Sequence, residues 1–294
     1  MGRGSRLFAG ALFFCGATSV AQAYTATGDR QFPATVLLPQ IGPSDEAYLT
    51  GATLPQAGDP GGPNGRASSF AATVDKTVTD RLSVTVTEEY SAIDPGSGPT
   101  ATGWQNVTAE AQYTLVVDPV HEFLFALGVQ REFPATGADR VGASHQGATM
   151  PMMFFGKGLG DLDIGLLRPL AIGGYAGFNV PDGGPRTGAW NSGFFVEYSI
   201  PYLEANVRTF DLPDLIRNLT PMVEVSMTNP VGAPGAASTL VIGPGLNYSG
   251  DGWDFGIEAL VPTSRAAGVG TGVTAQLHIQ LDYLFPRSLG KPLF

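Results

Sequence analysis

The sequence predicts an all-β protein: a single transmembrane antiparallel up-and-down β-barrel of about twelve strands. Three observations predict this fold: an N-terminal leader, apolar and polar residues that alternate in stretch after stretch, and 40 Gly and 23 Pro residues that separate those stretches. After the leader, no apolar run is long enough for a transmembrane helix. Only helices and closed barrels satisfy every backbone polar group in lipid, so a membrane protein of this composition is expected to be a barrel.

Residues 1–23 have the three parts of a signal peptide. Arg3 and Arg6 provide the positive charge, residues 7–15 form a short apolar run, and an A-x-A cleavage motif ends at Ala23. We expect export with cleavage after Ala23; a retained N-terminal anchor is the alternative. Cys15, the single cysteine, lies within this leader. The mature chain therefore offers no thiol for chemistry or for metal binding.

The clearest alternation lies in the predicted closing strand, residues 272–285. Its odd positions from 273 to 285 are apolar, and its even positions from 274 to 282 are polar. Successive side chains of a strand point to opposite faces of the sheet, so one face of this strand is apolar and the other polar. In a barrel that spans a membrane, the apolar face contacts lipid and the polar face lines the lumen.

The same alternation predicts the other strands, and parity sets their number. The closing strand is expected to end on the periplasmic side, and the number of strands is expected to be even. Counting back from the closing strand then makes residues 45–54 the first strand. Residues 24–44 then form an N-terminal periplasmic or plug segment, 45–285 the barrel, and 286–294 a tail that ends in Phe294. The predicted strands are 45–54, 68–74, 82–90, 105–117, 122–133, 149–156, 162–178, 193–203, 219–228, 238–248, 253–261 and 272–285.

The connections and the aromatic residues agree with a barrel. Short links alternate with longer Gly- and Pro-rich links, as expected for periplasmic turns and extracellular loops. Residues 204–218 are the exception, and we expect a single helical turn within them. Trp104, Trp190 and Trp253 fall at the ends of predicted strands, which is typical of aromatic girdles at the two membrane interfaces. Aromatic core filling in a soluble β-sandwich is the alternative.

The charge of the chain argues against nucleic-acid binding. Sixteen basic residues less Arg3 and Arg6 leave 14 against 26 acidic ones, so the mature chain has a formal charge of −12. Affinity for nucleic acids depends on basic side chains that neutralise phosphates. We therefore expect no nucleic-acid partner.

Four stretches of the chain resemble a known family. They are F-F-G-K-G-L-G-D-L-D-I-G-L-L-R-P-L at 154–170, Y-S-I-P-Y-L at 198–203, G-I-E-A-L-V-P at 256–262 and L-F-P-R-S-L-G-K-P-L-F at 284–294. They resemble exported proteobacterial outer-membrane transporters of the family named after the meta-pathway of phenol degradation. The resemblance extends over residues 45–294. It implies an outer-membrane barrel that takes up small apolar or aromatic molecules, and it carries no catalytic or ligand residues.

No catalytic motif is present, and we expect neither a cofactor nor a metal site. The sequence lacks H-E-x-x-H, a P-loop and a G-x-S-x-G elbow. The G-K-G-L-G sequence at 156–160 lies in a predicted tight turn rather than a phosphate-binding loop. His278 on the inner face could activate a serine, as in outer-membrane phospholipase A, or could belong to a polar network in the lumen. The second interpretation is favoured, so the protein is not expected to be an enzyme.

The lumen is the candidate functional site. Alternation places several carboxylates and few bases on the inner face. These acids either pair with bases and brace the wall or line a path that favours cations. The inward candidates are Glu110, Glu197, Glu224, Glu258, His278, Gln280 and Asp282.

The sequence thus predicts an outer-membrane channel or transporter for passive uptake of small molecules. An occluded structural or signalling barrel is the alternative, and a lipid-modifying barrel enzyme is a third hypothesis. The expected partners are outer-membrane lipids, a small-molecule solute, and the barrel assembly machinery, which would recognise the C-terminal strand and Phe294.

Overall fold

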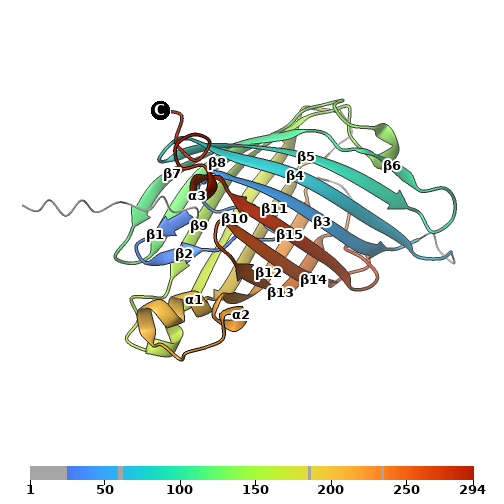
Figure 1. The fold of residues 1–294 in the computed structure, drawn as a ribbon. Helices are drawn as coiled ribbons and strands as arrows, with labels where there is room; N and C mark the ends of the chain where they lie inside the picture. The colour runs from blue at the N-terminus through green and yellow to red at the C-terminus, as the bar shows by residue number, and fades with distance from the viewer. Residues whose placement is uncertain (1–24, 59–61, 185–186, 233–234) are drawn as a thin grey trace, which may run out of the picture.

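The computed structural model describes residues 25–58, 62–184, 187–232 and 235–294. The predicted signal peptide, residues 1–23, lies outside the described residues. Most of the described chain forms one closed antiparallel sheet (Figure 1). Its strands are β3 (Glu46–Gln56), β4 (Gly65–Thr79), β5 (Leu82–Asp94), β6 (Ala101–Trp104), β7 (Thr108–Asp118), β8 (Phe123–Glu132), β9 (Ala148–Gly158), β10 (Leu170–Pro181), β11 (Ala189–Tyr198), β12 (Leu219–Pro230), β13 (Thr239–Ser249), β14 (Trp253–Pro262) and β15 (Gly272–Gln280).

The sheet closes into a barrel of twelve strands, which confirms the predicted fold. β6 and β7 follow one another along β5 and together make one strand of the wall. Every other strand pairs with its neighbour in the chain, and β15 returns to pair with β3. A closed barrel has no free strand edge, so all its ladders are satisfied without help from the solvent.

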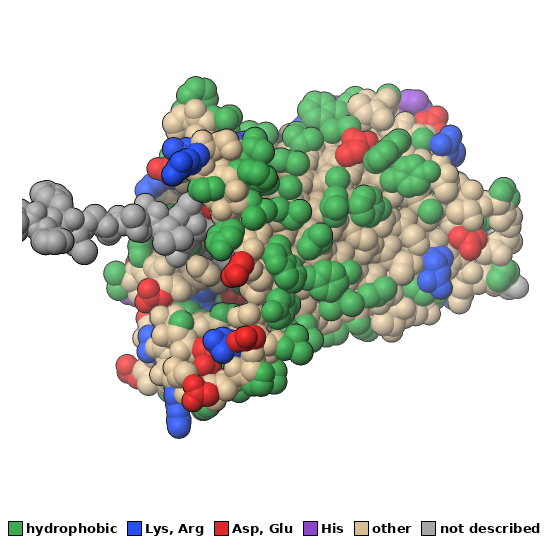
Figure 2. All heavy atoms as spheres, in the orientation of Figure 1, with side chains coloured by type: hydrophobic (Ala, Val, Ile, Leu, Met, Phe, Trp, Pro, Cys, Tyr) green, Lys and Arg blue, Asp and Glu red, His purple; other side chains and the backbone are tan. Residues whose placement is uncertain are grey.

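The two faces of the wall differ as the alternation predicted. In β15 the exposed fraction is 38% for Leu277, but 4% for Gln276 and 1% for His278. Hydrophobic side chains cover the middle of the outer surface, and charged ones gather mainly toward its two ends (Figure 2). Trp104 and Trp253 lie on this surface at the ends of strands, next to Tyr90 and Tyr248 respectively. The apolar outer belt therefore has the composition expected of a wall that contacts lipid.

The closing strand is shorter than predicted. β15 ends at Gln280, whereas alternation suggested a strand and a barrel that extend to Phe285. Gln280 pairs with Glu46, the first residue of β3, and the last backbone bond between the two chain segments runs from the Leu281 amide to the Asp45 carbonyl at 2.9 Å. The backbone instead turns into the short helix α3 (Leu281–Leu284), in which the Phe285 amide donates to the Leu281 carbonyl at 2.7 Å.

Two other predicted strands extended too far. β10 begins at Leu170 rather than at residue 162, because Pro169 has no N–H to donate and the preceding residues form the 3-10 turn η2 (Gly165–Leu167). β11 ends at Tyr198 rather than at residue 203. Ser199 there accepts the Tyr202 amide at 3.1 Å and caps a helix.

The helices are all short and lie between or beyond the strands. None of those in the described chain is long and apolar enough to cross a membrane. The helical turn expected within residues 204–218 is α2. The helices are η1 (Asp139–Val141), η2, α1 (Ile200–Tyr202), η3 (Leu203–Val207), α2 (Asp214–Arg217) and α3.

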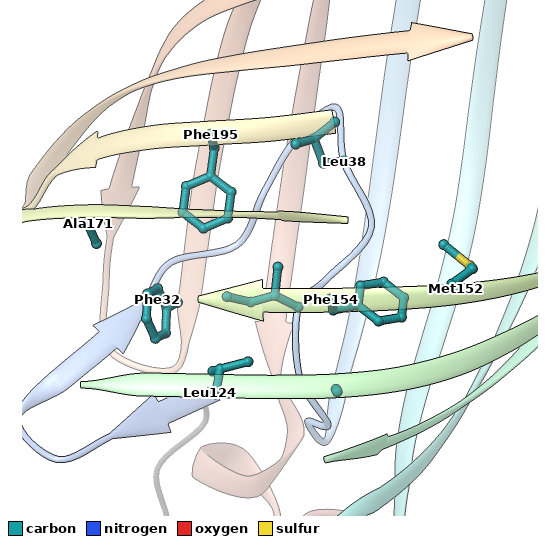
Figure 3. Packing of buried hydrophobic residues seen from close by; sticks show 9 residues of the cluster. Phe32, Leu38, Leu124, Met152, Phe154, Ala171 and Phe195 are labelled. Atoms are coloured by element: carbon teal, nitrogen blue, oxygen red, sulfur yellow. The ribbon is translucent and has the colours of Figure 1, made fainter. Parts of the chain in front are cut away.

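Residues 25–44, which we call the inner segment, form no part of the wall. They begin with a separate hairpin, β1 (Thr25–Thr27) and β2 (Arg30–Phe32), at the barrel end that carries the short turns. Phe32, Leu38 and Ile41 of this segment are buried against apolar side chains of the wall. Figure 3 shows Phe32 beside Leu124, with Phe154 and Met152 farther along β9 and the chain continuing among the strands. The apolar core of the molecule thus lies inside the barrel, between the wall and its own N-terminal chain.

The outer face gives a first test of the fold. Leu277→Arg places a charge on the apolar belt and is expected to lower the free energy of unfolding by roughly 2–4 kcal/mol in lipid vesicles. Urea titration of the reconstituted protein measures this loss. Val120→Arg is the control, because Val120 lies in an exposed turn (77% exposed) where a charge meets water. Equal losses in the two variants would contradict a lipid-facing Leu277.

Candidate functional site

Arg30 anchors the inner segment to the barrel end with the short turns. Its side chain is fully buried, and its Nε donates to Oε2 of Glu122 at 3.2 Å. Its two Nη groups donate to the carbonyls of residues 168–170, in the connection between β9 and β10. A buried guanidinium is stable only when its donors find partners and its charge is balanced, and both conditions are met here.

Tyr202 completes this anchor. Its ring lies under the Arg30 guanidinium, 4.0 Å from Cζ to the ring centroid, and its hydroxyl donates to Oε1 of Glu122 at 2.7 Å. Burial and the neighbouring Glu122 carboxylate raise the pKa of the Tyr202 phenol, so the hydroxyl keeps the proton that it donates. The Gly160 amide donates to the same carboxylate at 3.0 Å. Three separate connections of the barrel thus meet at one arginine of the inner segment.

A second contact lies deeper in the barrel, at Glu224 of β12. Its carboxylate accepts three consecutive backbone amides of the inner segment: Val36 at 2.8 Å, Leu37 at 2.9 Å and Leu38 at 2.8 Å. Thr35 holds this turn, because its Oγ1 donates to the Leu38 carbonyl at 2.7 Å. Successive amides that converge on one anion form a concave nest, here filled by a side chain of the wall.

Other polar groups beside this turn lack hydrogen-bond partners. The carboxylate oxygens of Glu197 and the amide group of Asn247 are buried and make no hydrogen bond within the described part of the chain, and the buried Glu258 carboxylate receives no N–H or hydroxyl donor there. All three residues are about 1% exposed. The Glu258 carboxyl interacts with that of Glu224, and the Glu197 carboxyl experiences the charges of Arg30 and Glu224. Buried polar groups without partners are rare, so this part of the lumen has unmet demand for donors.

His278 belongs to a separate network on strands β3, β14 and β15. Its Nε2 lies 2.7 Å from Oε2 of Glu46, and its Nδ1 lies 3.5 Å from Oδ2 of Asp254. Gln280 donates to the same Asp254 oxygen at 2.8 Å. Both ring nitrogens therefore face carboxylates, which leaves neither of them to activate a serine. The arrangement is that of a bracing network across the β3–β15 seam.

The remaining inward candidates lie elsewhere. Glu110 is half-buried and accepts a weak hydrogen bond from Gln130 at 3.5 Å. Asp282 is not on a strand. It lies in α3, which follows the end of β15, and is 6% exposed. Burial raises the pKa of its carboxyl to about 6. The candidates thus separate into the Glu224–Glu258 group with Glu197, the His278–Gln280 network, and the isolated residues Glu110 and Asp282.

Sequence reasoning missed the basic residues that organise the lumen. Arg30 contacts Glu122 across 92 positions of the chain, a separation at which no local pattern could reveal the pair. Lys76 similarly pairs with Asp45 at the seam and donates to the Lys291 carbonyl of the tail at 2.6 Å. No cluster of three metal-ligating side chains occurs among the residues that the structure describes.

Solved structures of outer-membrane barrels share this fold. An outer-membrane channel from Pseudomonas putida F1 aligns with a TM-score of 0.54 and 9% identity, over 85% of this chain and 99% of that one. The KdgM porin aligns with a TM-score of 0.48 and 9% identity (79% and 98% coverage), and LpxR from Salmonella typhimurium with 0.47 and 10% (79% and 99%). No family model matches the chain, and no curated protein does. At such identities the likeness concerns the fold alone. The resemblance to the phenol meta-pathway family therefore stays a prediction.

The three amides held by Glu224 give a direct test of the site. Glu224→Ala removes their acceptor, and amide hydrogen exchange at residues 36–38 is expected to speed up at least about ten-fold, because hydrogen bonds to charged groups are worth more than 1 kcal/mol each. Mass spectrometry of the reconstituted protein measures this exchange. Glu110→Ala is the matched control and leaves exchange at these amides unchanged. Equal exchange in both variants would show that Glu224 does not hold the segment.

Proposed function

We propose that this chain is a bacterial outer-membrane channel for passive uptake of small molecules, and that its inner segment closes the lumen. The observation that carries the proposal is the way in which the lumen is filled. A barrel that serves only as a scaffold can fill its interior with side chains of the wall. Here a separate stretch of backbone fills it. Polar contacts attach this stretch to the wall at Arg30, at the amides of residues 36–38, at the Gln40 carbonyl and at the Ser44 hydroxyl, and a stretch of this kind can move without unfolding the wall.

The outer surface and the fold support a location in the outer membrane. A continuous apolar belt with tryptophans at the strand ends fits a bilayer, and the barrel resembles those of outer-membrane proteins. We propose that residues 1–23 direct export and are cleaved after Ala23. The end with the short turns, where Arg30 is held, then faces the periplasm.

The inner walls favour small solutes with an apolar part. Phe154, Phe195 and Met152 are buried on strands β8–β11 together with Leu124, and they meet the inner segment rather than lipid. Withdrawal of the segment would leave this apolar surface facing the lumen, next to the acidic one, because Phe195 pairs with Glu224 in the ladder. Apolar walls with a few directed polar groups are typical of sites for small molecules.

The alternative is a permanently occluded structural barrel, and one observation favours it. Arg30 is completely buried, and its hydrogen bonds reach a side chain and three carbonyls. A contact of this kind could hold the segment in place at all times. The channel and the occluded barrel differ in one respect: only in the channel does release of Arg30 open a path for solutes through the lumen.

Conductance of the Arg30→Ala variant decides between them. Loss of the guanidinium leaves Glu122 buried without its charge partner, which favours departure of the inner segment. In planar bilayers the variant is expected to conduct more often than the wild type. Arg131→Ala is the control, because Arg131 pairs with Asp182 near the ends of β8 and β10 and does not touch the inner segment.

The same recordings report ion selectivity. Glu197, Glu224 and Glu258 outnumber the inward bases in their part of the lumen, so the open variant is expected to pass cations in preference to anions. A wild type and an Arg30→Ala variant that both remain silent would contradict the channel. A conducting variant that prefers anions would contradict the role of these acids.

Two partners remain part of the proposal. The apolar belt would contact outer-membrane lipids, and the C-terminal tail with Phe294 would be read by the barrel assembly machinery. Phe294 is 93% exposed, and its amide donates to the Val78 carbonyl at 3.0 Å. The ring is therefore accessible while the backbone of the tail is fixed against β4.

A further inference from the structure

The turn formed by residues 35–38 meets an apolar and an acidic region of the lumen, which adjoin where Phe195 of β11 pairs with Glu224 of β12. On one side it packs on the apolar cluster: Leu38 is 6% exposed and shares that cluster with Phe195 and Phe154 (Figure 3). On the other side its amides point at Glu224. The turn thus presents an apolar body to one wall and N–H donors to the other.

Two glycines of β13 make space for the Glu258 side chain on the acidic wall. Gly243 and Gly245 of β13 lie beside Glu224 and Glu258 respectively in the ladder. A Cβ atom at Gly243 would lie 2.4 Å from Oε2 of Glu258 and 3.5 Å from Cδ2 of Leu37, and one at Gly245 would lie 2.4 Å from Cγ of Glu258. Only glycine at these positions lets the Glu258 side chain lie across β13, next to the inner segment.

The turn satisfies this wall only in part. All three of its amides go to Glu224. No donor of the turn reaches Glu258, whose carboxyl lies against that of Glu224, and the amide group of Asn247 has no partner among the described residues. Asn247 lies on the same face of β13, two residues from Gly245. It pairs with Gly256 in the ladder, and the Val36 side chain packs over that glycine. Glu224 and Glu258 therefore have only three neutral N–H donors between them, and all three point at Glu224.

We propose that the space occupied by this turn is a solute site for small organic cations, made of an apolar body with an ammonium head. The site rests on the proposed channel function, and the inner segment acts there as a stand-in for the solute. The body replaces Leu37 and Leu38 on the apolar wall. The ammonium replaces the three amides and lies between Glu224 and Glu258.

The number of N–H donors and the charge that Glu224 and Glu258 require identify the head group of the solute as an ammonium. An ammonium offers three N–H donors and a full positive charge, so it can serve both carboxylates, with bonds stronger than those from neutral amides. A neutral alcohol offers one donor and no charge. An anion is repelled by the same two acids. The apolar wall in turn separates an arylammonium from a small cation such as methylammonium, which buries little apolar surface.

The test compares four probes on the full protein in detergent or lipid: benzylammonium, benzyl alcohol, benzoate and methylammonium. Calorimetry at neutral pH is expected to give benzylammonium an affinity at least about ten-fold above each of the others, as loss of a charged hydrogen bond implies. Benzylammonium also competes with the inner segment, so it is expected to speed amide exchange at residues 36–38. Methylammonium does so only weakly.

Glu258→Gln keeps the shape of the side chain and removes its charge. It is expected to abolish the preference for benzylammonium over benzyl alcohol, whereas Asp251→Asn, in an exposed turn, leaves that preference unchanged. Heat-dependent gel migration checks that both variants fold. Equal affinity for benzylammonium and benzyl alcohol, or a preference that survives Glu258→Gln, overturns the site.

Failure of the site and failure of the channel are distinguishable. If Arg30→Ala conducts but the four probes bind alike, the channel stands and the cation site is wrong. If Arg30→Ala does not conduct, the channel is wrong, and the site falls with it as a solute site. Selective binding together with conductance supports both.

Discussion

The pairing of β3 with β15 is the constraint on which the rest of the structure depends. It joins the first strand of the wall to the last, from Val273 opposite Thr53 to Gln280 opposite Glu46. Closure removes the free edges that a sheet cannot leave unpaired in lipid. It also determines the fate of the chain on either side. The residues before Glu46 have no place in the ladder and enter the lumen, and those after Gln280 turn into α3 and the tail.

The inner segment then resolves the conflict that closure creates. A narrow barrel with an acidic inner face buries carboxylates, which are costly to bury without partners. The segment supplies a guanidinium at one end and three amides deeper inside, and its apolar side chains cover the apolar cluster on the adjoining strands β8–β11. The segment offers no hydrogen bond to Glu258 or Asn247, so it stabilises the closed lumen but leaves these two polar side chains without a partner in the segment. An occupant of this kind can be displaced by a solute that satisfies the same wall better.

Alternation was sufficient to predict the wall, because lipid outside and water inside impose opposite demands on successive residues. Leu277 and Gln276, adjacent in the chain, show this contrast directly. The ends of strands were predicted less well. Asp282 continues the alternation of β15, yet it lies in a helix, because the end of a strand depends on where its partner begins. The site was hardest to predict. The inward direction of Glu224 is visible in the sequence, but its partners are backbone amides 186 to 188 positions away, and backbone amides have no sequence signature.

A reversible cross-link between the inner segment and the wall tests the central claim most directly. Cβ of Val36 lies 3.8 Å from the position of a Cβ atom at Gly256, a separation typical of disulfides, so cysteines at the two positions can form one. The mature sequence contains no other cysteine. With Val36→Cys and Gly256→Cys introduced into the Arg30→Ala protein, we expect no conductance when the disulfide is formed and full conductance after reduction. Equal conductance in the oxidised and reduced states, with the disulfide verified by mass spectrometry, would contradict closure of the lumen by the inner segment.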